Sequence, residues 1–241
     1  MSEAKVGSLG WGRFVLQFLT VVVLYIAATV PAIVIFGMTS LGLLGSVAFS
    51  MAAALALCWV WLRKDNALGA AWDLSIPRPF WRTLALALLA AGLVIAWFQV
   101  GTLLMKTLGL GAPQVTEILD FVTESPTSLA LWIVVVAWFA AGFGEELLYR
   151  GFLMDRLQRL RGIGGNIWLV IFIQAALFGI SHGYQSMSGV IVTGVVGFFF
   201  GWLRVRCGGN LWACIIAHAL VDTLMMSAAY AGKVGLIPIA S

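Results

Sequence analysis

Charged residues are scarce in this chain of 241 residues: 10% are Asp, Glu, Lys or Arg, and 62% are hydrophobic. Soluble globular domains carry about 25% charged residues, so this composition excludes an ordinary soluble fold. Cysteine is also scarce. Cys58, Cys207 and Cys214 lie in or beside apolar segments without metal-ligand spacing, which argues against a disulfide framework. The chain also lacks a long polar linker, a clear repeat, a P-loop and a dinucleotide fingerprint.

Long apolar runs dominate what is present. A helix needs about 20 residues to cross the hydrocarbon core, and seven runs approach or exceed that length. They cover residues 13–37, 40–62, 82–105, 128–155, 165–182, 187–204 and 210–230, and an eighth, half-inserted helix is expected near 108–125. The sequence therefore predicts an all-α fold: a polytopic integral membrane bundle of about 7–8 transmembrane helices, forming a single domain over residues 1–241.

The basic residues fall on one side of these helices. Cytoplasmic loops carry an excess of Lys and Arg, so we expect a cytoplasmic N-terminus and an uncleaved first helix. That side holds Lys5, Arg13, Arg63, Lys64, Arg78, Arg82, Arg156, Arg159, Arg161, Arg204 and Arg206, whereas only Lys106 and Lys233 fall on the other. Topology explains the basic pI, and no nucleic-acid partner is expected. The short chain suggests a multi-pass protein of the cell membrane, most simply a bacterial inner membrane.

Three further local features occur in or between these apolar runs. The stretch 61–81 mixes charges with Trp72 and Trp81, as an interfacial segment does, and we interpret it as a lipid anchor or, less readily, a substrate guide. Glycine clusters at 162–165 and 208–209 predict turns. Gly197 and Gly201 have the GxxxG spacing that allows close helix approach, which we assign to internal packing.

The run GEELLYRGFL places Glu145, Glu146 and Arg150 among apolar residues. Ionisable groups inside a bilayer are costly and mark functional sites. The only two histidines also lie in apolar segments, within FGISH (Phe178 and His182) and HALVD (His218 and Asp222). Their joint occurrence predicts an assembled site in preference to a helix end at the membrane surface.

The depths of these residues agree only if one helix runs unbroken from about 128 to about 160. A rise of about 1.5 Å per residue then lifts Glu145 roughly 20 Å above Arg156, Arg159 and Arg161. The same rise places His182 about 25 Å above the turn at 165, and His218 to Asp222 about 13 to 20 Å above the turn at 209. The site would lie within the bilayer, in a cavity that admits water.

Spacing assigns roles to these side chains. Glu146 and Arg150 are four apart, so we expect an orienting or structural pair on one helix face. Glu145 projects about 100° away and is the candidate general base. Asp222 could hold His218 in one tautomer or bind substrate, and Phe178 could shield and orient His182. This set suits hydrolysis of an acyl bond, most plausibly a peptide, with stabilisation of the oxyanion.

Two other chemistries stay open on the residues alone. Glu145, His182 and His218 could hold a catalytic zinc ion, although no HExxH motif occurs in the chain. Ser181 lies in a GxSxG pattern and could form a dyad with His218, but that motif normally needs a strand and a sharp turn.

The three motifs resemble EExxxR, FxxxH and Hxxx(N/D) of the CAAX protease and bacteriocin-processing (CPBP, or Abi) family, which includes the type II prenyl-protein endopeptidase. The resemblance covers residues 128–226, the expected catalytic core, and implies an intramembrane endopeptidase. In that family scheme Glu145 would activate water, His182 and His218 would complete the site, and Asp222 would stand where many members have Asn. The family is often labelled as metalloprotease, yet a metal-free glutamate mechanism is the first choice here.

The resemblance also implies partners and roles. Membrane-associated peptides or proteins, including pheromone or bacteriocin precursors, are the expected substrates, and bacteriocin immunity is a role found in the family. One rival is a non-catalytic membrane immunity or scaffold protein. A proton-coupled transporter is another, but inverted repeats and paired broken helices are not evident.

Overall fold

The computed structural model describes residues 8–237, and within them all helices and turns form one helical assembly without a named strand. Lys5, expected on the cytoplasmic side, lies outside the described residues. The elements are α1 (Trp11–Phe36), α2 (Ser40–Lys64), α3 (Leu68–Ala71), α4 (Phe80–Thr107), α5 (Thr116–Val122), α6 (Pro126–Trp132), η1 (Ile133–Leu153), α7 (Met154–Arg159), α8 (Ile167–Ser181), η2 (Gly183–Gln185), α9 (Ser186–Arg206) and α10 (Trp212–Lys233).

Six helical stretches in the described chain are long and apolar enough to cross a membrane. They are Trp11–Phe36, Ser40–Lys64, Phe80–Thr107, Pro126–Arg159, Gly183–Arg206 and Trp212–Lys233. The polytopic helical bundle is thus confirmed. The predicted span at 165–182 is shorter than expected, because α8 has 15 residues and covers only about 22 Å. The expected half-inserted helix near 108–125 is reduced to the seven residues of α5.

One continuous helix carries the acidic motif. α6, η1 and α7 follow one another without interruption from Pro126 to Arg159, as the depth argument required. The central segment η1 is π-helical, which the sequence did not predict. A π-helix closes i→i+5 hydrogen bonds; it is rare overall and often occurs at functional sites.

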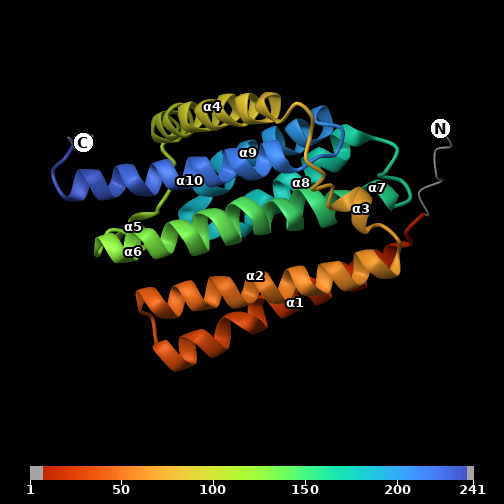
Figure 1. Cartoon of the computed structure of the whole chain (residues 1–241), viewed down its shortest axis with the longest axis horizontal. Coiled ribbons are helices and arrows are strands. Elements are labelled where there is room, and N and C mark those ends of the chain that lie inside the picture. Colours follow the sequence, from red (N-terminus) through yellow and green to blue (C-terminus); the bar gives the residue numbers. More distant parts are fainter. Residues whose placement is uncertain (1–7, 238–241) are drawn as a thin grey trace.

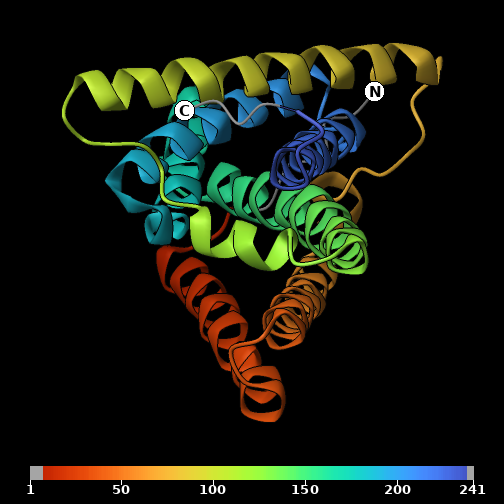
Figure 2. The ribbon, with the colours of Figure 1, turned by 90° about the vertical axis from the view of Figure 1, so that its left-hand side faces the viewer.

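The helices form two unequal groups (Figures 1 and 2). α1 and α2 make a hairpin that diverges from the rest of the bundle, and α2 alone packs along η1. α10 lies between η1 and α4, while α8 and α9 run side by side on the other flank. The three motif-bearing elements η1, α8 and α10 therefore belong to one group, and the α1–α2 hairpin faces them.

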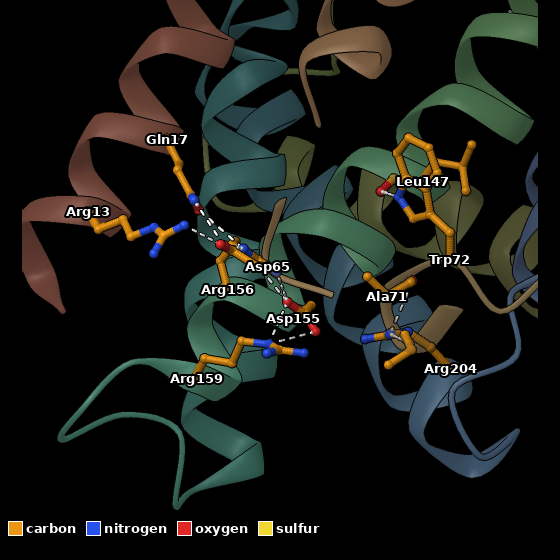
Figure 3. A network of polar contacts seen from close by, with 11 residues as sticks. Arg13, Gln17, Asp65, Ala71, Trp72, Leu147, Asp155, Arg156, Arg159 and Arg204 are labelled. Atoms are coloured by element: carbon orange, nitrogen blue, oxygen red, sulfur yellow. Dashed lines mark hydrogen bonds and ion pairs between the residues drawn. The ribbon is translucent and has the colours of Figure 1, made fainter. Parts of the chain in front are cut away.

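Polar contacts hold the helices together at the end where α1 begins and α2 and α7 end (Figure 3). Arg156 is fully buried there and donates hydrogen bonds to Asp65, Asp155 and Gln17. Arg13 also pairs with Asp65, and Arg159 pairs with Asp155 at 2.9 Å. Three of the basic residues predicted to share one side, Arg13, Arg156 and Arg159, thus lie together at this end, where they pair with carboxylates. We call this end of the molecule the basic end.

The segment after α3 packs against η1 through Trp72 and also includes residues of interfacial character. The indole N–H of Trp72 donates to the carbonyl of Leu147 at 2.9 Å, and Trp72 packs directly on Gly151. Trp72 is therefore not the lipid anchor that the composition suggested. Trp81, in contrast, is 64% exposed and lies beside the Arg82 guanidinium, as an interfacial residue would.

Candidate active site

Five of the residues singled out by the motifs line one cavity of about 920 Å³. Glu145 comes from η1, Phe178 and His182 from the end of α8, and His218 and Asp222 from α10. The cavity lies between these helices and the α1–α2 hairpin, and its other walls are largely apolar. A concave apolar site with a few convergent polar groups is the usual form of a ligand pocket.

Glu146 lies behind the cavity and is fully buried. Its Oε1 accepts a hydrogen bond from Arg150 Nη1 at 3.0 Å and another from His218 Nδ1 at 2.8 Å. The Glu146–Arg150 pair was predicted from its i,i+4 spacing. The bond to His218 was not, because no sequence pattern connects η1 with α10.

Arg150 is also fully buried and is held by more than its ion pair. Nη2 donates to the carbonyl of Gly197 at 3.3 Å, and the guanidinium lies 4.3 Å from the ring centre of Phe178 and 5.3 Å from that of Phe200. A buried guanidinium needs a carboxylate partner and further acceptors. Arg150 thus connects the acidic motif to both α8 and α9.

Glu145 faces the cavity, as its projection away from Glu146 predicted. Its Oε2 lies 3.9 Å from His218 Nε2, and Asp222 Oδ2 lies 4.0 Å from the same nitrogen. Since the carboxylate of Glu146 accepts from Nδ1, that nitrogen carries the proton in neutral His218, and the Nε2 lone pair faces Glu145 and Asp222. The expected role of Asp222 in setting the tautomer of His218 falls to Glu146 instead.

His182 is oriented in a similar way by a different acceptor. Its Nδ1 lies 2.8 Å from the carbonyl oxygen of Phe178, so Nδ1 is the donor and Nε2 is left for a ligand. The imidazole ring also contacts the Phe178 ring, with the ring centres 4.7 Å apart and the ring planes tilted by 53°. Phe178 therefore orients His182 with both its ring and its backbone, where the sequence suggested only the ring.

Ser181 does not form the alternative dyad. Its hydroxyl donates to the carbonyl of Phe178 at 2.7 Å, and no hydrogen bond joins it to His218 among the described residues. It ends a helix, without the strand and sharp turn that expose a nucleophilic serine.

The zinc interpretation requires three ligands close together. No group of three or more His, Cys, Asp or Glu side chains between residues 8 and 237 could hold a metal ion. The side chains as placed therefore do not fit a preformed metal centre, and no catalytic step below depends on one.

Comparison with known families gives a match over the part of the chain that carries this site. Residues 127–224 match the model described as Rce1-like, type II CAAX prenyl endopeptidase. Neither the curated proteins nor the solved structures contain a match to this chain. All three motifs lie inside the matched stretch, so the predicted relationship to the CPBP family is confirmed, and over residues 127–224 this membrane-spanning chain is similar to the type II CAAX prenyl endopeptidases.

Proposed function

We propose that this protein is an intramembrane endopeptidase that hydrolyses peptide bonds of membrane-associated peptides or proteins, with Glu145 as the general base. The observation that carries the proposal is the separation of 3.9 Å between Glu145 Oε2 and His218 Nε2 at the cavity wall. When His218 is neutral and carries its proton on Nδ1, both atoms are acceptors, so a water molecule about 2.8 Å from each could donate one hydrogen to each.

The reaction follows from that arrangement. Glu145 takes a proton from the water as its oxygen attacks the substrate carbonyl carbon, and the protonated carboxyl then gives that proton to the leaving amine as the C–N bond breaks. Glu146 contributes by holding His218 Nδ1–H, which keeps Nε2 directed at the water. We assign contact with the oxyanion to His182, with Asp222 as a further group for binding substrate.

The substrate class rests on the site and on the family together. A large apolar cavity fits a substrate with apolar surface, and the matched family model is described as a type II CAAX prenyl endopeptidase. We propose membrane-associated peptides as the broad class, with prenylated and unmodified peptides as the two cases to separate.

The test compares three purified proteins: the wild type, Glu145→Gln, and the matched control Glu117→Gln, which changes an exposed glutamate of α5. Each is incubated with prenylated and unmodified membrane peptides, with and without a chelator, and the products are read by mass spectrometry. We expect wild type and Glu117→Gln to cleave, and Glu145→Gln to lose at least about 100-fold in kcat, the lower end of the usual general-base contribution.

Full turnover by Glu145→Gln with unchanged thermal stability would contradict the proposal. Loss of cleavage in the chelator arm alone would assign the enzyme to the metalloproteases. A well-folded wild type that cleaves nothing would favour a non-catalytic membrane partner.

A further inference from the structure

Gln174 is a buried polar residue that the motifs do not include. It lies in the middle of α8, its side chain is 0% exposed, and neither its amide oxygen nor its amide nitrogen has a hydrogen-bond partner among the described residues. Burying an amide without partners costs free energy, and buried polar groups in native proteins are almost always satisfied. A fully buried glutamine on an apolar helix therefore needs a specific partner.

The amide occupies the seam between α8 and α9. A Cβ atom on Gly201 would lie 2.8 Å from Gln174 Oε1, so the absence of a side chain at Gly201 makes room for the amide. One turn further along the two helices are Phe178 and Gly197, and both contact the Arg150 guanidinium. Gln174 is thus about one helical turn, or about 5.4 Å, from the layer that contains Arg150.

The same buried region contains complementary groups that also lack partners. Arg150 Nε is a donor, Glu146 Oε2 is an acceptor, and neither makes a hydrogen bond to a described residue. Gln174 adds one acceptor oxygen and an NH₂ group with two donors. A single water molecule can accept about two hydrogen bonds and donate two more. Two bonds of about 2.8 Å each, one on either side of a water, can therefore bridge about one helical turn.

We propose that a water molecule bound between Gln174 and Arg150 fixes the Arg150–Glu146–His218 chain, which makes Gln174 a positioning residue for the active site. Arg150 Nε–H donates to the water oxygen, and the water donates to Gln174 Oε1. The guanidinium is then held on a third side, in addition to Glu146 and the Gly197 carbonyl. The catalytic part of this inference rests on the proposed peptidase function.

The test uses Gln174→Met, which keeps an unbranched side chain of similar length and removes the amide. The matched control is Gln17→Met, because Gln17 is also 0% exposed but lies at the basic end, bonded to Asp65 and Arg156. We expect Gln174→Met to lower kcat about tenfold at nearly constant KM, since a misaligned site loses transition-state stabilisation and not substrate binding. Gln17→Met should lower thermal stability and leave kcat unchanged.

A high-resolution experimental structure supplies a readout that does not depend on activity. In the wild type we expect an ordered water within about 3.2 Å of both Arg150 Nε and the Gln174 amide, and in Gln174→Met we expect that water to be lost. A wild-type structure that resolves other buried waters but none at this position overturns the proposal, as does an unchanged kcat for Gln174→Met. A wild type that holds the water but cleaves no peptide overturns the proposed function and leaves the water site in place.

Discussion

At the scale of single residues, the two adjacent glutamates of the EExxxR motif have separate environments. Glu146 is fully buried and accepts hydrogen bonds from Arg150 and His218, whereas Glu145 lines the cavity and is 22% exposed in its side chain. A buried carboxylate with two charged or polar donors is suited to hold them in place. A carboxylate at a cavity wall is suited to meet substrate and water.

This difference predicts that two conservative substitutions both remove activity but differ in their effect on stability. Glu146→Gln leaves the buried guanidinium of Arg150 without its counter-charge, so we expect a loss of about 3–5 kcal/mol in unfolding free energy and a loss of activity. Glu145→Gln should change stability by less than about 1 kcal/mol while abolishing cleavage. Thermal unfolding in detergent, measured on both variants beside the wild type, checks the contrast. Equal stability of the two variants would show that Glu146 is not the structural member of the pair.

Asp222 follows His218 by one helical turn in the HALVD motif. Its Oδ2 lies 4.0 Å from His218 Nε2, too far for a direct hydrogen bond. An ionised carboxylate accepts hydrogen bonds but donates none, so it cannot stabilise an oxyanion as an amide can. The geometry therefore favours a role for Asp222 in binding a donor on the substrate.

At the scale of helices and loops, close backbone approach sets the geometry of the site. Glycines at the α8–α9 seam allow Phe178 to sit against α9 with Arg150 over its ring. Trp72 performs a similar task on the opposite side by donating to a carbonyl of η1 next to the glutamates. The π-helical segment is thus held from two sides, which keeps Glu145 and Glu146 at defined positions.

The seam predicts the effect of adding a side chain at Gly197. A Cβ there would lie 3.0 Å from Phe178 Cδ1 and 3.2 Å from Ala175 Cα, so Gly197→Val forces α8 and α9 apart. We expect a loss of about 1–3 kcal/mol, as for other overpacked cores, together with reduced cleavage because Phe178 orients His182. Gly92→Val is the control, since nothing lies within 4 Å of a Cβ at that exposed position of α4. Unfolding in detergent measures both, and equal stability of the two variants would refute tight packing at the seam.

At the scale of the whole molecule, charge and polar pairing are concentrated at the basic end. Arg156 connects α7 to Gln17 of α1 and to Asp65 at the end of α2, and Arg204 donates to the Ala70 and Ala71 carbonyls of α3 (Figure 3). The α1–α2 hairpin is thus tied to the motif-bearing helices at this end. Further along, the two groups diverge and enclose the cavity.

The orientation of this end in the membrane is a prediction that Cys207 can test. Cys58 and Cys214 are buried, and Cys207 lies half-buried at the end of α9, where burial raises the pKa of its thiol. We expect a membrane-impermeant maleimide to label Cys207 in inside-out vesicles and not in intact cells, with Cys207→Ser as the control. Because the thiolate is the reactive form, labelling should be slow at pH 7 and accelerate as the pH rises. Labelling from outside the cell would place the basic end on the external face and reverse the predicted topology.

Several features of the site were predictable because they are local or compositional. The i,i+4 pair of Glu146 and Arg150 and the contact between Phe178 and His182 follow from spacing along one helix. The unbroken helix, predicted from about 128 to about 160 and found from Pro126 to Arg159, follows from the depth that the site residues must share. Gly208 and Gly209 adopt positive φ angles of 67° and 96°, as expected for the turn before α10. The short α8, the π-helical η1 and the packing of Trp72 against η1 were not predictable, since each depends on contacts with distant segments.

The sequence by itself determined a helical membrane protein with one strongly basic side and a polar constellation related to the CPBP family, because hydropathy, charge bias and motif spacing are written along the chain. Only the tertiary structure decided that Glu146 holds His218, that Glu145 faces a cavity lined in part by the α1–α2 hairpin, and that the amide of Gln174 is buried without a hydrogen-bond partner among the described residues. These contacts are between residues on different helices. Their distances depend on how the helices pack against one another, and the residue pattern within one helix does not determine that packing.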